Sequence, residues 1–221
     1  MQSTGKFITF EGAEGVSKST QAKLLFEYFK NSGMFPIVHH MSFPTCDTSI
    51  GEFIRSGILS GEKTLSSECI YHLFVANRWE KQKEIDLILK AGGIIICDRY
   101  VDSGISYGIS NGLDMQWCLK MEEGLTIPTH VIHLQIPNQH LEQMFTERVL
   151  QRDNNNNNDN SHNVVEIYDT LEWQRKIQTS FAKLHDQRLV EGYDAKWTTL
   201  DIYPNMSIDQ VHELVLKCIM I

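Results

Sequence analysis

The chain has 221 residues, a formal net charge of -8 at pH 7 and 42% hydrophobic residues. This length fits one domain, and the hydrophobic content excludes a disordered or fibrous chain. The acidic balance argues against a nucleic-acid binder, whose usual signature is a basic face, but it leaves room for a local basic pocket that binds small anions.

Strands and helices are expected to alternate along the chain. In chain order the expected elements are strand 6–11, helix 19–30, strand 36–41, a loop at 43–50, a short amphipathic stretch at 54–59, helix 68–89, strand 94–97, strand 129–135, helix 138–152, helix 171–189, strand 198–202 and helix 208–219. The unbroken apolar run at 94–97 is typical of a central strand buried on both faces. This alternation predicts a single three-layer α/β domain, in which helices flank a parallel sheet.

Cysteine usage and hydropathy indicate the cell compartment. The five cysteines are scattered and form no C-x-x-C pair, so neither a zinc ribbon nor a disulfide framework is expected. No run approaches the ~20 apolar residues of a membrane span, and the N-terminus lacks the pattern of a signal peptide. We therefore expect a cytoplasmic protein, with the nucleus as the alternative, that has no membrane contact.

A low-complexity segment, DNNNNNDNSHN, occupies residues 153–163. A run of Asn cannot bury apolar surface and favours turns and disorder. We interpret it as an inert loop expansion. The alternative is that it lengthens a lid at about 145–170.

The segment between the first strand and the first helix has the residue types of a phosphate-binding loop. It reads G-A-E-G-V-S-K-S, which departs from the P-loop pattern G-x-x-x-x-G-K-[ST] only at Ser17. In such a loop, backbone N–H groups and the helix N-terminus hold phosphate, the lysine neutralises the β and γ phosphates, and the hydroxyl holds Mg²⁺. The predicted ATP-binding residues are Gly12, Ala13, Glu14, Gly15, Val16, Ser17, Lys18, Ser19 and Thr20, with Ser19 also a magnesium ligand. A glycine-rich turn with a solvated lysine is the plain alternative.

Ser17 is the main anomaly of this loop. If the backbone there is left-handed, a Cβ costs about 1–2 kcal/mol. We therefore expect Ser17 to weaken the use of Mg-ATP without abolishing it.

A second polar motif, Asp98-Arg99-Tyr100, follows the buried strand. Ligands of a parallel sheet bind beyond the carboxyl ends of its strands, where the phosphate loop also lies. Asp98 is predicted to orient the metal, and Arg99 to bridge donor and acceptor phosphates. An exposed ion pair is the plain alternative for this triplet.

Five motifs taken together resemble the thymidylate kinase family. They are FEGAEGVSKSTQ at 10–21, FPTCDTSIG at 43–51, LFVANRWE at 73–80, CDRYVDSGISY at 97–107 and EIYD at 166–169. They occur in the family's order and cover most of the chain. The resemblance implies a P-loop NTPase fold, transfer of the γ-phosphoryl group of ATP to dTMP with Mg²⁺, and a homodimer.

The resemblance also implies a dTMP site. Phe74 matches the aromatic that stacks on thymine, Arg78 the arginine at the base's carbonyl edge, and Arg99 the arginine at the acceptor phosphate. The full expected set is Glu14, Phe43, Arg55, Phe74, Arg78, Arg99, Ser103, Gly104, Tyr107 and Tyr168. Phe74 and Tyr107 have a plain alternative as packed core residues.

The chain departs from the family pattern at two positions. Cys46 stands where an acceptor-phosphate arginine is expected, and Arg55 is a candidate replacement. Gly15 is not the basic residue that usually accompanies ANRWE, so Arg148 and Arg152 are candidates for that charge, with Arg148 also placed to pack on adenine. The expected catalytic set is Lys18, Asp98, Arg99, Arg148 and Arg152. Solvated helix charges are the alternative for the last two.

These departures keep two rival functions open. One is a related nucleotide kinase with another acceptor, which Cys46 and Glu14 motivate. The other is a nucleotide-binding paralogue that is catalytically impaired, which Ser17, Cys46 and Gly15 motivate. An activity panel over several acceptors separates the first rival, and binding without product formation supports the second.

Overall fold

A parallel sheet forms the centre of the computed structural model, which describes residues 5–156 and 170–219, without the side chains of 151–156. In these residues the strands are β1 (Lys6–Glu11), β2 (Val38–Ser42), β3 (Ile94–Asp98), β4 (His130–Gln135) and β5 (Lys196–Asp201). They pair in the order β2-β3-β1-β4-β5, and every pairing is parallel. The predicted three-layer α/β fold is confirmed.

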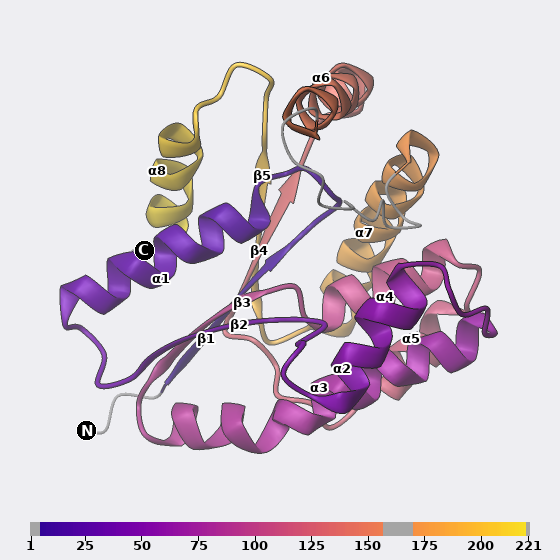
Figure 1. The fold of residues 1–221 in the computed structure, drawn as a ribbon. Coiled ribbons are helices and arrows are strands. Elements are labelled where there is room, and N and C mark those ends of the chain that lie inside the picture. The colour runs from indigo at the N-terminus through magenta and orange to yellow at the C-terminus, as the bar shows by residue number, and fades with distance from the viewer. Residues whose placement is uncertain (1–4, 157–169, 220–221) are drawn as a thin grey trace.

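Helices cover both faces of the sheet (Figure 1). On one face lie α1 (Lys18–Ser32) and α8 (Ile208–Ile219), and on the other lie α3 (Ser67–Lys90), α4 (Val101–Ser110) and α7 (Leu171–Glu191). The remaining helices of the described residues are α2 (Ser49–Phe53), the π-helical turn η1 (Ile54–Leu59), α5 (Met115–Met121) and α6 (Asn138–Asn156). None of the helices in this part of the chain combines the length and hydropathy needed to cross a bilayer.

Alternate side chains of β3 enter the two cores. Ile94 and Ile96 pack in the cluster with Leu25 of α1, whereas Ile95 and Cys97 pack in the cluster that contains Ile85 of α3. Side chains of a strand point to opposite faces in turn, so a strand covered on both faces is apolar throughout. The unbroken run at 94–97 therefore correctly indicated a strand buried on both faces, although β3 is an interior strand next to the central β1.

The structure contains helices that the sequence pattern did not predict. Part of the expected loop at 43–50 is already helical, because α2 begins at Ser49 and the Thr48 side chain caps it by accepting from Gly51 N at 3.1 Å. Helix α4 was also missed, since glycine and serine lower its intrinsic helix propensity. Tertiary packing selects it: a Cβ at Gly108 would lie 2.7 Å from the Tyr71 ring.

The expected loop at 153–163 begins later than predicted. Helix α6 was expected to end at residue 152 but continues to Asn156, four residues into the Asn-rich segment. Extending an existing helix is far less costly than nucleating one, so a weak helix former such as Asn can still be included. Residues 157–163 lie outside the described part of the chain, and the lid at about 145–170 stays a prediction.

Candidate functional site

The phosphate loop joins β1 to α1 at the carboxyl edge of the sheet. Gly12 has a φ of 138°, and a Cβ there would lie 2.1 Å from the Leu134 carbonyl oxygen, so only glycine fits. Ser17, the residue before α1, has φ 62° and ψ 21°, and its side chain forms no capping hydrogen bond. The left-handed backbone that makes Ser17 an anomaly is therefore present.

Lys18 lies beneath this loop. Its residue is only 4% exposed, and its Nζ donates to the Ala13 carbonyl oxygen. Burial and the neighbouring Arg99 lower the pKa of Lys18 to about 8, although Glu14 and Asp98 oppose the shift. The ammonium group thus lies at the phosphate loop among both acidic and basic side chains.

Ser19 and Asp98 meet at the start of α1 and the end of β3. The Ser19 hydroxyl donates to Oδ2 of Asp98. Oδ1 of Asp98 is buried and has no hydrogen-bond partner among the described residues. Two hard oxygen donors, one of them unsatisfied, suit Mg²⁺.

Arg99 connects the phosphate loop to the neighbouring pocket. Its backbone is left-handed, with a φ of 65°. Nη1 donates to the Gly12 carbonyl oxygen at 2.9 Å and to the Ser103 hydroxyl at 3.2 Å, and Nη2 donates to the Glu14 carboxylate. Burial alone would raise the pKa of Glu14, but Arg99 and Lys18 outweigh it and bring that pKa to about 2.

A pocket of about 740 Å³, its open mouth included, lies beside Arg99. Its largely apolar lining with a few polar side chains is typical of a small-molecule site. The predicted dTMP residues that line it are Glu14, Phe43, Phe74, Arg78, Arg99, Ser103, Gly104 and Tyr107. The structure thus brings these residues together around one cavity.

Two of the predicted dTMP residues are not among those lining the pocket. Arg55 is exposed, and its Nη1 lies 3.9 Å from the Cys46 sulfur. It therefore lies beside the residue it was expected to replace, but outside the cavity. Tyr168 falls outside the described residues.

Arg148 reaches the phosphate loop from α6. A Cβ at Gly15 would lie 2.5 Å from Nη1 of Arg148, so the guanidinium fills the space that a side chain at position 15 would take. Its charge also helps to lower the pKa of Glu14. The side chain of Arg152 lies outside the described part of the chain.

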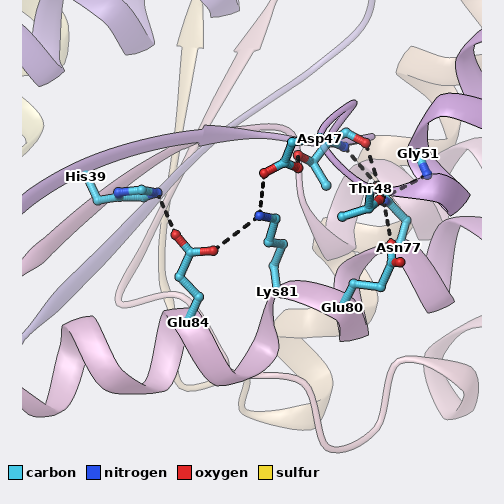
Figure 2. A network of polar contacts seen from close by, with 9 residues as sticks. His39, Asp47, Thr48, Gly51, Asn77, Glu80, Lys81 and Glu84 are labelled. Atoms are coloured by element: carbon cyan, nitrogen blue, oxygen red, sulfur yellow. Dashed lines mark hydrogen bonds and ion pairs between the residues drawn. The ribbon is translucent and has the colours of Figure 1, made fainter.

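The loop between β2 and α2 is fastened to α3 by a polar network (Figure 2). Asn77 is fully buried; its Oδ1 accepts from Thr45 N at 2.9 Å and its Nδ2 donates to the Thr48 hydroxyl at 3.0 Å. Lys81 donates to Asp47 at 2.6 Å and forms an ion pair with Glu84 at 3.3 Å. The same helix carries Phe74 and Arg78, so it fixes the position of the loop relative to the pocket.

The sequence did not predict the buried acidic residues that hold the site residues in place. Glu11, at the end of β1, accepts from Tyr100 N at 2.9 Å and from the Ser103 hydroxyl. Burial and the nearby Asp102 raise the pKa of Glu11 to about 8. An acid at the end of a β-rich run was a usable signal for Glu11, whereas nothing local marks Glu122, which pairs with Arg78.

Comparison with known proteins agrees with this geometry. The family model described as thymidylate kinase matches residues 10–215. A thymidylate kinase from Plasmodium falciparum is 35% identical over 215 residues, covering 96% of this chain and 89% of its own length, and one from Arabidopsis thaliana is 31% identical, covering 95% and 73%.

A solved structure of thymidylate kinase from Candida albicans superposes with a TM-score of 0.73 at 26% identity, covering 98% of this chain and 92% of that one. A second solved thymidylate kinase, from Ehrlichia chaffeensis, has a TM-score of 0.69 at 22% identity and supports the fold. The fold is therefore that of the P-loop NTPases. With its phosphate loop, its adjoining pocket and a family match over most of its length, the chain belongs to the thymidylate kinase family, phosphotransferases that phosphorylate dTMP at the expense of ATP.

Proposed function

We propose that residues 12–20 hold the phosphates of ATP and that the pocket beside Arg99 holds dTMP, so that the γ-phosphoryl group passes between them. The convergence of the phosphate loop and the pocket on Arg99 carries this proposal. Arg99 touches the Gly12 carbonyl oxygen on one side and lines the pocket on the other. A guanidinium there bridges the two phosphates that react.

On the donor side, backbone N–H groups at the start of α1 and the ammonium group of Lys18 bind the phosphate oxygens. Ser19 and Asp98 would supply oxygen ligands for Mg²⁺, which the unsatisfied Oδ1 of Asp98 supports. A magnesium ion held there would neutralise negative charge on the phosphates of ATP. Arg148, which lies against Gly15, adds a positive charge from α6. It thereby replaces the basic side chain that the family pattern has at position 15.

On the acceptor side, the dTMP phosphate oxygen attacks the γ phosphorus as the bond to the ADP oxygen breaks. This oxygen is already an anion, so no strong general base is required. Phe74 stacks on the base, and Glu14 and Tyr107 lie near the sugar, where the Tyr107 hydroxyl and the Glu14 carboxylate are 3.5 Å apart. The roles of Arg55 as a phosphate contact, and of Tyr168 and Arg152, stay predictions.

Coupled ADP release with Mg-ATP tests this proposal, with dTMP present or absent. We expect turnover that depends on dTMP and exceeds that with dUMP, dGMP, CMP or thymidine. Faster turnover with another acceptor in this panel would support the related kinase. Binding of ATP and dTMP without product would support the impaired paralogue, and the double variant Ser17→Gly with Cys46→Arg would then test whether those two residues cause the loss.

We also propose a homodimer, as the family resemblance implies. Sedimentation velocity at micromolar concentration tests it directly. A species with the 25.4 kDa mass of one chain would contradict this proposal.

A further inference from the structure

A buried ion pair forms one wall of the pocket. Arg78 is 1% exposed and Glu122 is 6% exposed. Nε of Arg78 donates to Oε2 of Glu122 at 3.0 Å and Nη2 donates to Oε1, so the contact is bidentate. The Tyr71 hydroxyl donates to the same Oε1 at 2.9 Å. Burial alone would lower the pKa of Arg78, but Glu122 raises it, and the guanidinium stays charged.

Gly104 confines the same guanidinium from α4. A Cβ at position 104 would lie 2.6 Å from Nη2 and 3.0 Å from Nη1 of Arg78. A side chain at position 104 would therefore displace the Arg78 guanidinium. Gly104 was expected only as a dTMP contact. The geometry shows that glycine is also required there to leave room for Arg78.

This arrangement leaves one edge of Arg78 to the pocket. Arg78 lines the cavity, and within the described residues the Glu122 carboxylate takes up Nε and Nη2 but not Nη1. A guanidinium N–H can only donate a hydrogen bond. A carbonyl oxygen of a ligand can accept a hydrogen bond from Nη1, whereas an amino group at the same place would bring two hydrogen-bond donors together.

We propose that Glu122 is a positioning residue, which holds Arg78 so that Nη1 selects a pyrimidine with a carbonyl at C4 over one with an amino group there. This inference rests on the proposed placement of the nucleobase in the pocket. Glu122 follows α5 and is separated by 44 residues from Arg78. It contacts the base only through Arg78.

The test compares dTMP with 5-methyl-dCMP, which carries an amino group in place of the C4 carbonyl. Dissociation constants of both are measured by calorimetry, together with dTMP turnover and the KM for ATP. Glu122→Gln keeps the side-chain size but replaces one acceptor oxygen with a donor. We expect the preference for dTMP to shrink about 10-fold or more, with the KM for ATP unchanged. Tyr71→Phe, which removes one hydrogen bond to the carboxylate, shifts the preference in the same direction by a smaller factor.

A matched buried pair serves as the control. Arg188 donates to Oδ1 of Asp102 from Nε at 3.3 Å and from Nη2 at 3.0 Å, and neither residue lines the pocket. Asp102→Asn should lower the melting temperature and leave the ratio of the two dissociation constants unchanged.

An unchanged ratio in folded Glu122→Gln would overturn the inference. If that variant does not fold, an unchanged ratio in Tyr71→Phe overturns it instead. Absence of dTMP turnover in the parent protein would contradict the proposed function, whereas the ratio of dissociation constants would still decide the role of Glu122.

Discussion

Replacing Ser17 with glycine should stabilise the protein and speed its use of ATP. With φ 62° and ψ 21°, Ser17 holds a left-handed conformation that costs an L-residue about 1–2 kcal/mol. Glycine removes that cost, but its greater freedom in the unfolded chain offsets about 0.4–1 kcal/mol. The midpoint of the first range exceeds that of the second by about 0.8 kcal/mol, so Ser17→Gly should be more stable than the parent by that amount. For a chain of this size, this free energy raises Tm by about 2–3 °C.

Ser66 provides a matched control, because it also precedes a long helix. Its backbone is extended, with φ -63° and ψ 153°, and its side chain accepts from Cys69 N at 3.2 Å. Ser66→Gly therefore loses a cap worth a few tenths of a kcal/mol and adds unfolded-state entropy. We expect its Tm to fall by about 2–4 °C, opposite in sign to Ser17→Gly.

Calorimetric melting of the three proteins measures the stability effect, and coupled ADP release measures the rate. If all of the 0.8 kcal/mol acts on the loop in its ATP complex, turnover at subsaturating ATP rises about 4-fold. A Tm that falls in Ser17→Gly as it does in Ser66→Gly would refute the strain argument. An unchanged or lower rate would refute the view that Ser17 weakens the use of Mg-ATP.

The remaining predictions concern the charges around the phosphate loop. Lys18→Ala and Arg99→Ala should each lower kcat by about 100-fold or more while keeping the parent circular dichroism spectrum, and near-parent turnover in either would remove that residue from the mechanism. Because the pKa of Lys18 is lowered to about 8, kcat/KM for ATP should fall as pH rises through that value, and a profile level to pH 9.5 would contradict this. The pKa of Glu11 is raised from 4.5 to about 8, so the stability tied to its protonated form is complete below pH 4.5 and is lost as pH rises through 8. Glu11→Gln has no carboxyl group to lose that proton. Urea unfolding should therefore show that its stability relative to the parent increases between pH 5 and pH 9, by about 1.4 kcal/mol for each unit by which the pKa is raised. A difference that does not change with pH would count against the shift.

The sequence predicted the parts of the site whose chemistry is local. The phosphate loop and the triplet that begins at Asp98 each follow a strand, and a parallel sheet brings the ends of its strands to one edge. Their alignment could therefore be inferred without coordinates. Helix α4 was missed because Gly104 and Gly108 weaken its local signal, while packing against Arg78 and Tyr71 is what requires them.

Contacts between distant segments leave no local signal in the sequence. The family resemblance named Arg148 as a candidate for the charge missing at Gly15, and the structure places its guanidinium there across 133 positions. Glu122, which pairs with Arg78 across 44 positions, was not predicted, because a charged residue at the end of a helix is common. Only the folded topology brings each pair together, so Arg78 could be assigned to the site but not its partner.

The contact between Arg99 and Glu14 has a consequence for affinity. Before any acceptor arrives, the guanidinium already has a carboxylate on Nη2 and the Gly12 carbonyl oxygen on Nη1. If an acceptor phosphate binds Arg99 as proposed, its arrival exchanges one anion for another, and the free energy gained is only the difference between the two partners. On that proposal we expect low affinity for phosphate groups and weak competition by inorganic phosphate, and the Glu14 carboxylate can return to Arg99 when the charged product leaves.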